Sequence, residues 1–488
     1  LNYSGAKLRN TASNDDVNDF FRTGATFNNS ISVSGGTETV RTYFSYANSY
    51  SDGMMRNNNY KRNTLSFRQS YSLFNKKLNV DLSLNYVQAK TKNRPGGGTV
   101  MNPLYDLYRM PRNVDLNYYK ENYYIENGKW TSNEQSYFDS KNNKWTTGTV
   151  ELTGPKQEWA YWQNGMNNPY WMVNTRNSIS EEERAYGYIS ANYQIIDGLK
   201  IQGRLSLDRT KMKGTSERMA TTWNISAMED YGMYGQDLNW INEVYVDALL
   251  SYDKQIKDFS ISATTGWTGH TLKGETQKLW AKATTANWKH DTMPTLINFF
   301  EPSVSQGNVS ERSYTLSSNW DKGLLFTGQI GWQEKVYLEG SYRRDWYRAF
   351  KQYSYRGTPT NYGYFSVGAN ALLHQIVTLP EVITNLKVRA SYSEVGNSIP
   401  NVLYNARNTD PLTGAAVPSS YSYFNNPIPE KTKSFEAGFD ISLFGSALNW
   451  DMTYYNSAMH NSYLTISDLG GLKKPVNAGV IRNQGIET

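Results

Sequence analysis

The chain has 488 residues, a mean hydropathy of −0.67 and a formal net charge of +6. The absence of cysteine excludes disulfides, thiolate metal sites and cysteine nucleophiles. No apolar run reaches 18 residues, so no transmembrane helix is expected, and the small net charge does not indicate a nucleic-acid partner. Because the chain starts at Leu1 and stops within a strand-like pattern, we expect it to be an internal piece of a longer protein.

The clearest strand pattern of the sequence covers residues 78–88. One parity is apolar and holds Leu78, Val80, Leu82, Leu84 and Tyr86, whereas the other is polar and holds Asn79, Asp81, Ser83 and Asn85. Strand side chains alternate between two faces, so this segment has one apolar and one polar side. About ten residues are enough for a tilted strand to cross the bilayer core. The pattern predicts a membrane-crossing strand with one lipid-facing side.

The same pattern recurs in seven strand pairs. In chain order, their turns are expected at 35–38, 74–77 and 197–198, between 250 and 259, between 332 and 336, between 372 and 386, and at 445–446. The Asp197-Gly198 dipeptide is a strong hairpin signal. The pairs are separated by connections at roughly 50–61, 89–183, 209–242, 269–321, 346–361, 395–432 and from 458 onward. Short turns therefore alternate with connections that are mostly long.

Outer-membrane β-barrels show this asymmetry, with short periplasmic turns and long extracellular loops. We therefore predict an all-β fold, a transmembrane antiparallel up-and-down β-barrel in the outer membrane of a Gram-negative bacterium. About 14 strands are visible, with the start of another near Gly485. The 74–77 and 196–198 turns are expected to be periplasmic and the 89–183 loop extracellular. An aromatic content of 14% fits the aromatic belts of such barrels.

The inward parity of the predicted strands carries charges of both signs. They are Arg41, Arg68, Asp81, Arg204, Asp208, Glu339, Arg343, Lys387, Arg389, Glu436, Asp440 and Asp451. A water-filled pore could hold these groups, and a plug domain could pair with them. Residue patterns alone leave both possibilities open. Arg68, Arg204, Arg343 and Arg389 are our candidates for groups that face the lumen or a plug.

Several stretches resemble the SusC/RagA family of TonB-dependent transporters. They are Phe21–Gly24 with Ser32–Glu38, Gly331–Asp345, Leu386–Asn397, Pro429–Thr432 and Asn483–Glu487, in the order of the family's own motifs. The chain departs from the family pattern at Ser393, where a glycine is usual, and at Pro429, where a tryptophan is usual. These matches spread over nearly all of the chain.

The resemblance implies a 22-strand barrel with an N-terminal plug and a TonB box. On this basis we expect residues 1–23 to be a linker from plug to barrel, and residues 24–488 to be an incomplete barrel without the plug and the last strands. It also implies TonB-driven import of an oligosaccharide or a peptide, with a SusD-like surface lipoprotein as partner. Other expected contacts are TonB, through a plug outside this chain, and outer-membrane lipid.

Aromatic residues of the 89–183 loop are the candidates for contact with substrate or with the lipoprotein lid. They are Trp159, Tyr161, Trp162, Tyr170 and Trp171, in a loop that also holds Trp130 and Trp145. Aromatic faces stack on sugar rings and pack against peptide side chains. The simpler alternative is that these side chains pack the loop itself. Trp223, Trp240, Trp280 and Trp288 are expected in later loops, and Trp267, Trp332 and Trp450 on lipid-facing strand sides.

The sequence shows no catalytic signature. Its four histidines, His270, His290, His374 and His460, share no metal-ligand spacing, and Gly96-Gly97-Gly98 lacks the residues of a phosphate loop. We expect no enzyme activity, cofactor or metal. The leading hypothesis is active import of a nutrient oligomer, a glycan before a peptide. A passive porin or secretion channel, and a surface adhesin barrel, are the alternatives.

Overall fold

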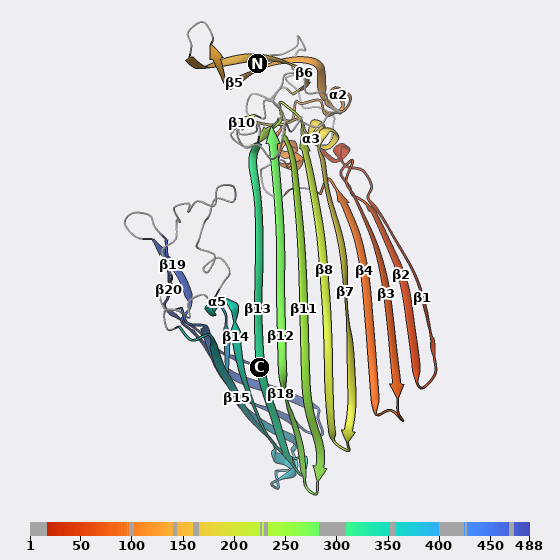
Figure 1. Cartoon of the computed structure of the whole chain (residues 1–488), viewed down its shortest axis with the longest axis vertical. Coiled ribbons are helices and arrows are strands. Elements are labelled where there is room, and N and C mark those ends of the chain that lie inside the picture. Colours follow the sequence, from red (N-terminus) through yellow and green to blue (C-terminus); the bar gives the residue numbers. More distant parts are fainter. Residues whose placement is uncertain are drawn as a thin grey trace.

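The computed structural model describes residues 17–94, 96, 102–139, 144–159, 165–224, 227–228, 233–282, 309–351, 358–399, 424, 427–467 and 473–488. Fifteen strands form one antiparallel sheet in the order β1-β2-β3-β4-β7-β8-β11-β12-β13-β14-β15-β16-β17-β18-β21. Figure 1 shows this sheet as a tall, strongly curved wall, with the short turns at one end and the long connections at the other. The structure therefore confirms the predicted antiparallel up-and-down architecture.

The strands of the wall differ greatly in length. The wall is built of β1 (Ala25–Gly36), β2 (Val40–Asp52), β3 (Asn59–Leu73), β4 (Leu78–Lys92), β7 (Asn177–Ile196), β8 (Leu199–Arg218), β11 (Met233–Ile256), β12 (Phe259–Lys282), β13 (Val309–Trp332), β14 (Val336–Tyr347), β15 (Asn361–Leu372), β16 (Ile383–Asn397), β17 (Glu430–Leu443), β18 (Leu448–His460) and β21 (Val480–Glu487). The middle strands β11, β12 and β13 have 24 residues each, whereas β14 and β15 have 12. The middle of the wall is therefore much taller than its later part.

Smaller elements occupy the long connections. They are η1 (Val17–Phe20), α1 (Pro103–Arg109), α2 (Leu116–Glu121), β5 (Tyr124–Asp139), β6 (Lys144–Gln157), α3 (Pro169–Thr175), β9 (Trp223–Asn224), β10 (Ala227–Met228), α5 (Arg348–Lys351), η4 (Leu373–Gln375), β19 (Tyr463–Ser467) and β20 (Lys473–Asn477). Helices α1, α2 and α3 are preceded by the N-cap residues Asn102, Asp115 and Asn168, whose side chains accept hydrogen bonds from backbone amides of the first turn. None of the described helices is long and apolar enough to cross a membrane.

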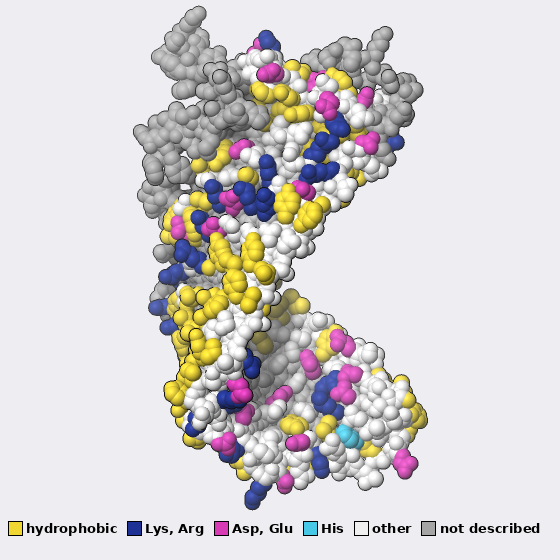
Figure 2. Space-filling view, turned by 90° about the vertical axis from the view of Figure 1, so that its right-hand side faces the viewer, with side chains coloured by type: hydrophobic (Ala, Val, Ile, Leu, Met, Phe, Trp, Pro, Cys, Tyr) yellow, Lys and Arg dark blue, Asp and Glu magenta, His cyan; other side chains and the backbone are white. Residues whose placement is uncertain are grey.

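The strand register agrees with the alternation read from the sequence. Leu82 lies opposite Gln69 on β3 and Ile189 on β7, whereas Asp81 lies opposite Ser70 and Ser190. Apolar side chains such as Leu84, which is 51% exposed, are uncovered on the outer side of the sheet. Figure 2 shows the hollow of the curved sheet, with Lys, Arg, Asp and Glu side chains gathered in its lower part. One side of the wall is thus an apolar belt and the other a charged inner surface.

The strands reach farther than we expected from the sequence. We expected connections at roughly 209–242 and 269–321, but β8 runs to Arg218, β11 begins at Met233 and β12 runs to Lys282. Trp240 and Trp280 therefore lie in strands rather than in loops, and Trp288 lies outside the described residues. Beyond the apolar belt both faces of the sheet contact water. Apolar and polar residues therefore no longer alternate there, although the backbone hydrogen bonds between the strands continue. This is why the pattern failed to mark these ends.

The long connections on one side of the molecule pack into a structure that we call the cap. It consists of η1, the 53–58 turn, the described residues of 102–176 and the 219–224 segment. Its apolar core contains Phe20, Met55, Leu107, Val114, Leu116, Tyr119, Trp159, Met166, Tyr170 and Val173. The cap lies at the long-connection end, above β4, β7, β8 and β11 (Figure 1).

Candidate functional site: the inner wall and the cap

Two arginines of the inner wall are bound to carboxylates that the sequence analysis did not single out. Arg204 of β8 contacts Asp247 of β11 at 2.7 Å, and the side chain of Asp247 is completely buried. Gln202 donates to the second oxygen of Asp247 at 3.1 Å. Charge-assisted bonds of this kind fix the side chain of the arginine. Because Arg204 itself is 40% exposed, water screens the pair and lowers its contribution to stability.

Arg343 forms the second fixed pair, within its own strand β14. Its Nε donates to Asp345 at 2.9 Å and its Nη2 donates to Thr268 of β12 at 3.2 Å. Tyr347 donates to the same carboxylate at 3.2 Å. Gly323 lies opposite Asp345 on β13, and a Cβ there would collide with both partners of the pair. A glycine at this position therefore leaves room for the Arg343–Asp345 pair against the wall.

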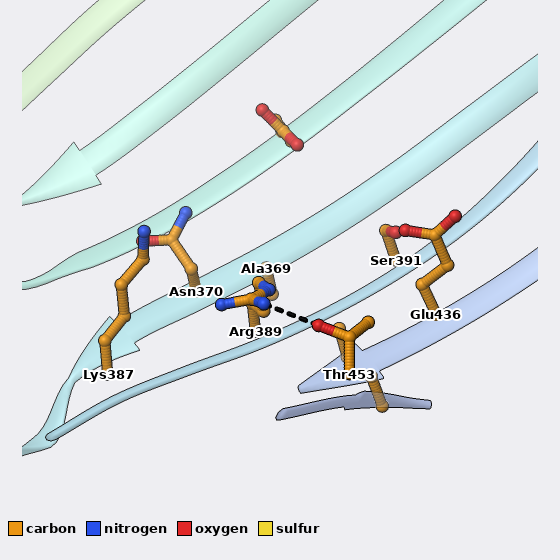
Figure 3. Close-up of a pocket in the computed structure, with 10 residues that line it drawn as sticks. Ala369, Asn370, Lys387, Arg389, Ser391, Glu436 and Thr453 are labelled. Carbon is orange, nitrogen blue, oxygen red and sulfur yellow. Dashed lines mark hydrogen bonds between the residues drawn. The ribbon is translucent and has the colours of Figure 1, made fainter. Parts of the chain in front are cut away.

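Arg389 of β16 lies at the centre of a shallow pocket of about 160 Å³ (Figure 3). It donates to Asp440 at 2.7 Å, to Asp451 at 2.9 Å and to Thr453 at 2.6 Å. The other polar groups that line the pocket are Glu339, Asn370, Lys387, Ser391 and Glu436. In Figure 3, Lys387 and Asn370 lie on one side of Arg389, and Ser391 and Glu436 on the other. The pocket therefore offers both signs of charge to a group in the lumen.

The free charges of this pocket are its lysine and its two glutamates. Lys387, Glu339 and Glu436 form no salt bridge with any residue that the structure describes. By contrast, Arg389 is held by two aspartates of β17 and β18. A ligand or a polypeptide segment in the lumen would meet the three free groups more readily than the arginine.

Arg68 lies in a second inner pocket, of about 470 Å³, at the short-turn end of β1, β2 and β3. Arg41 lines the same pocket, and neither arginine has a carboxylate partner within the described part of the chain. Nearby, Ser70 donates to Asp81 at 2.6 Å. Arg68 therefore differs from Arg204, Arg343 and Arg389, because its guanidinium remains available to an anion.

A histidine bridges two carboxylates higher on the inner wall. The Nε2 atom of His270 lies 2.7 Å from Glu243 of β11, and its Nδ1 atom lies 2.9 Å from Asp321 of β13. The three groups tie three neighbouring strands together above the apolar belt. No group of three or more His, Asp or Glu side chains among the described residues has the arrangement of a metal site.

Several buried polar groups of the cap are paired with one another through amide groups. Gln157 donates to Asn167 at 3.1 Å and accepts from the backbone amide of Asn168 at 3.0 Å. Asn167 binds the 219–224 segment through the backbone of Trp223, at 2.8 and 3.1 Å. Gln157, Asn167 and Asn168 are each at most 3% exposed. A buried network of this kind stabilises one arrangement of the loops only when its members are paired.

One carboxylate is buried in the cap. Asp106 of α1 is 5% exposed and accepts a hydrogen bond from the backbone amide of Asn167 at 3.1 Å. Burial raises the pKa of this carboxyl to about 6, although the bond from Asn167 and the charge of Arg109 act against the rise. The group therefore changes its charge close to neutral pH.

The aromatic candidates of the 89–183 loop lie inside the cap. Tyr170 and Trp171 are each 1% exposed and Trp159 is 6% exposed. Trp171 donates to Thr222 at 2.9 Å, and Tyr170 packs against Phe20 with ring centroids 5.1 Å apart. Their burial agrees with the packing alternative, and ligand contact by these residues stays a prediction. Tyr161 and Trp162 lie outside the described residues.

The expected linker from plug to barrel is described only from residue 17 onward. Its η1 packs into the cap, and Arg22 donates to the backbone oxygens of Gly53 and Asn58 at 2.9 and 3.1 Å. This part of the chain is thus anchored at the long-connection end. Its role as a linker stays a prediction.

The sequence analysis missed Asp247, Asp345 and the carboxylate partners of His270. A signal for the first two was present, because Asp247 follows the outward Val246 and Asp345 lies three residues after the outward Tyr342. Applying the alternation to these strands without interruption would have placed both on the inner face. The buried polar network of the cap had no such signal, because it forms between segments far apart in the chain.

Comparisons with known proteins agree with this architecture. Residues 220–488 match the family model described as "TonB dependent receptor-like, beta-barrel". The structure of the RagAB peptide transporter is similar with a TM-score of 0.71 and 17% identity, over 98% of this chain and 49% of that one. The structure of the RagAB peptide importer in its open-open state is similar with a TM-score of 0.72 and 18% identity, over 99% of this chain and 50% of that one.

A more distant fold relative is the ferripyoverdine receptor of the outer membrane of Pseudomonas aeruginosa. Its TM-score is 0.54 at 13% identity, over 95% of this chain and 52% of that one. The chain thus spans about half the length of these solved structures. No curated protein sequence matches it significantly. With a family model that covers more than half of its residues, the chain belongs to the TonB-dependent receptor-like β-barrel family and resides in the outer membrane of Gram-negative bacteria.

Proposed function

We propose that this chain is the barrel wall of a transporter that imports a nutrient oligomer by TonB-dependent active transport. The observation that carries the proposal is the inner wall, where Arg204, Arg343 and Arg389 are already paired while Arg41 and Arg68 are free among the described residues. An inner surface with fixed pairs and a few free charges suits a lumen filled by a movable polar domain. Proton-motive force would supply the work through TonB, so this chain needs no nucleotide site.

In this proposal the free groups bind a plug. Carboxylates of the plug would bind Arg41 and Arg68, and mixed charges would bind Lys387, Glu339 and Glu436. Such contacts are partly desolvated, so they would be strong enough to seal the lumen at rest. They would also have to break when TonB pulls.

For the transported compound, we propose a glycan first and a peptide second. The aromatic residues of the 89–183 loop are the basis for the glycan, although Trp159, Tyr170 and Trp171 would first have to leave the core of the cap. Two of the solved structures that the chain resembles are of the RagAB peptide transporter, which supports the peptide. We also propose a SusD-like surface lipoprotein as partner, with the long connections facing the outside.

Growth on defined nutrients would test the proposal directly. A strain that lacks the complete gene should fail to grow on one member of a panel of glycans and peptides, and the gene should restore growth. Growth should also be lost when TonB is deleted while the barrel is still made. If the deletion strain grows normally on every member of the panel, nutrient import is not its function, and an adhesin becomes the better interpretation.

A passive porin is the second candidate, because the hollow charged inner face could equally hold water. Planar bilayers distinguish the two functions. The full-length protein should show almost no steady conductance, because a plug would fill the lumen. Large stable openings of the unmutated protein would favour the porin.

A further inference from the structure

The outer face of the tall strands carries a basic band directly beyond the apolar belt. Toward the long-connection end, the largely apolar outward runs of β8, β11, β12, β13 and β14 end at Leu207, Val244, Trp267, Leu324 and Tyr342, with single apolar residues such as Trp240 and Leu316 farther on. Two residues farther, on the same face, Arg209, Lys322 and Arg344 are exposed. On β8, β13 and β14 the change from apolar to basic thus takes place within two residues, whereas Asn242 and Gly269 occupy the corresponding positions of β11 and β12.

Within β8 to β14 the charge of this band is predominantly basic. On the outward parity beyond the belt, the described side chains include six basic and two acidic residues, namely Arg209, Lys211, Lys213, Lys273, Lys322, Arg344, Glu217 and Glu275. On the neighbouring β7, Glu183 and Glu181 lie opposite Lys211 and Lys213, so the band is bounded by acidic residues on that side. The short turns at the opposite end hold both signs in near-equal number, namely Glu38, Lys76, Lys77, Asp197, Lys257, Asp258, Glu334, Lys335 and Glu381. If charged residues of either sign were simply placed at the membrane interface, the long-connection end and the short-turn end would carry similar mixtures of charge.

Three residues of the band are aligned across neighbouring strands. Arg209 lies opposite Asn242 of β11, and Asn242 lies opposite Lys273 of β12. Adjacent strands are about 4.8 Å apart, so the two cations are separated by about 10 Å at the backbone with an amide between them. All three side chains are exposed. Long basic side chains at this spacing can converge on one phosphate, with the amide of Asn242 as a further donor.

Neither cation of this row is neutralised by the protein. Arg209 and Lys273 have no carboxylate within salt-bridge distance among the residues whose side chains the structure describes. In the next row, Trp240 lies between Lys211 and Glu275. A ring at this level could lie against a sugar, as aromatic girdles do at membrane interfaces.

The band continues toward β14 with cations held against tryptophans. Lys322 lies over the ring of Trp320 at 5.4 Å, and Arg344 lies over the ring of Trp346 at 5.9 Å. Lys322 and Trp346 are cross-strand neighbours, so the two pairs form one surface. In Figure 2, dark blue side chains also gather directly above the yellow outer side chains of the sheet.

We propose that this band binds the phosphorylated sugar headgroup of an outer-leaflet lipid, with Arg209, Asn242 and Lys273 around a phosphate and Trp240 against the sugar. The position at the edge of the apolar belt favours a lipid, because its acyl chains would lie on the belt while its headgroup meets the cations. The proposal rests on the orientation with the long connections outside, and it is independent of what the barrel transports.

The test uses the full-length protein, delipidated in detergent and titrated with bisphosphorylated lipid A. Native mass spectrometry counts the bound lipids. The double variant Arg209→Gln/Lys273→Gln should bind about thirtyfold more weakly, since each basic group near an anionic lipid surface contributes about fivefold. The matched control Lys77→Gln/Lys335→Gln removes the same charge from the short-turn end and should bind as the wild type does.

Two further arms make the result specific. Lipid A without phosphates should bind weakly to the wild type and to the double variant, with the same affinity for both. The exchange Arg209→Lys/Lys273→Arg keeps the charge and should keep most of the binding, which covers the case in which the neutral variant folds poorly. Equal binding of both lipids by the wild type, or equal loss in variant and control, would overturn the proposal. A dimer of the delipidated protein that disappears in the double variant would instead assign the band to a second copy.

Discussion

The inner wall and the cap both hold polar groups away from bulk water, but they do so in different ways. In the wall, Arg204 and Asp247 meet because two adjacent strands present them at the same level and on the same face. In the cap, Gln157, Asn167 and Trp223 meet because separate loops dock on one another. The wall therefore depends on strand register, whereas the cap depends on a small core of its own. Each can be damaged without the other.

Trp171→Ala should have the largest effect and should be confined to the cap. Trp171 is 1% exposed and donates to Thr222, so its removal leaves a cavity and an unpaired hydroxyl. We expect a loss of about 3–5 kcal/mol in cap stability. Limited proteolysis should show faster cleavage within 102–176, with unchanged heat-modifiable mobility of the barrel. Tyr108→Ala, at a side chain that is 68% exposed, is the control, and equal effects of the two variants would show that the cap has no core of this kind.

Leu82→Arg should instead damage the wall and spare the cap once the protein is folded. Leu82 is on the lipid-facing parity between Gln69 and Ile189, where a charge costs about 2–4 kcal/mol at mid-depth. Asp81→Arg, one residue earlier, places the same side chain on the inner face and should assemble much better, although it loses the bond from Ser70. Heat-modifiable gel mobility reports assembly. An equal or worse defect for Asp81→Arg would contradict the register.

The cap should respond to pH through Asp106. Its carboxyl has a pKa of about 6 in the folded cap, against an ordinary value of 3.8, so the folded state binds the proton more tightly. Cap stability should therefore fall as pH rises from about 4 to 6, by up to about 3 kcal/mol, and should then level off. Asp106→Asn should remove this dependence and stabilise the cap at pH 7.5. Hydrogen exchange at the amide of Asn167, corrected for intrinsic exchange rates, would measure the pH dependence of cap stability. If Asp106→Asn keeps the pH profile of the wild type, Asp106 is not the cause of that dependence.

The same difference explains what the sequence could predict. Alternation placed Leu82 and Asp81 on opposite faces, and it located the hairpins at 74–77 and 197–198, because strand period and turn chemistry are local properties. It failed for 209–218, where Lys211 and Lys213 continue a strand without an apolar face. It could not predict the cap interior either, since Asn167 and Trp223 are brought together only by tertiary packing. The outward basic band was visible in the sequence only after these strand ends were known.

The smallest predicted effect is the coupling within a wall pair, which a double-mutant cycle can isolate. Arg204 and Asp247 should couple by about 1–2 kcal/mol, because the carboxylate is buried and doubly bonded while the arginine is partly screened. Arg184 and Asp208 occupy the same face of β7 and β8 but are exposed by 44% and 25%, so their coupling should stay below about 1 kcal/mol. The free energies of unfolding by urea, measured in lipid vesicles for the wild type, the single variants and the double variants, give both double-mutant cycles. If the exposed pair couples as strongly as the buried one, burial is not what sets the strength of these contacts. If neither pair couples measurably, the wall arginines are free to exchange partners, and Arg204 and Arg389 return to the candidates for binding a plug.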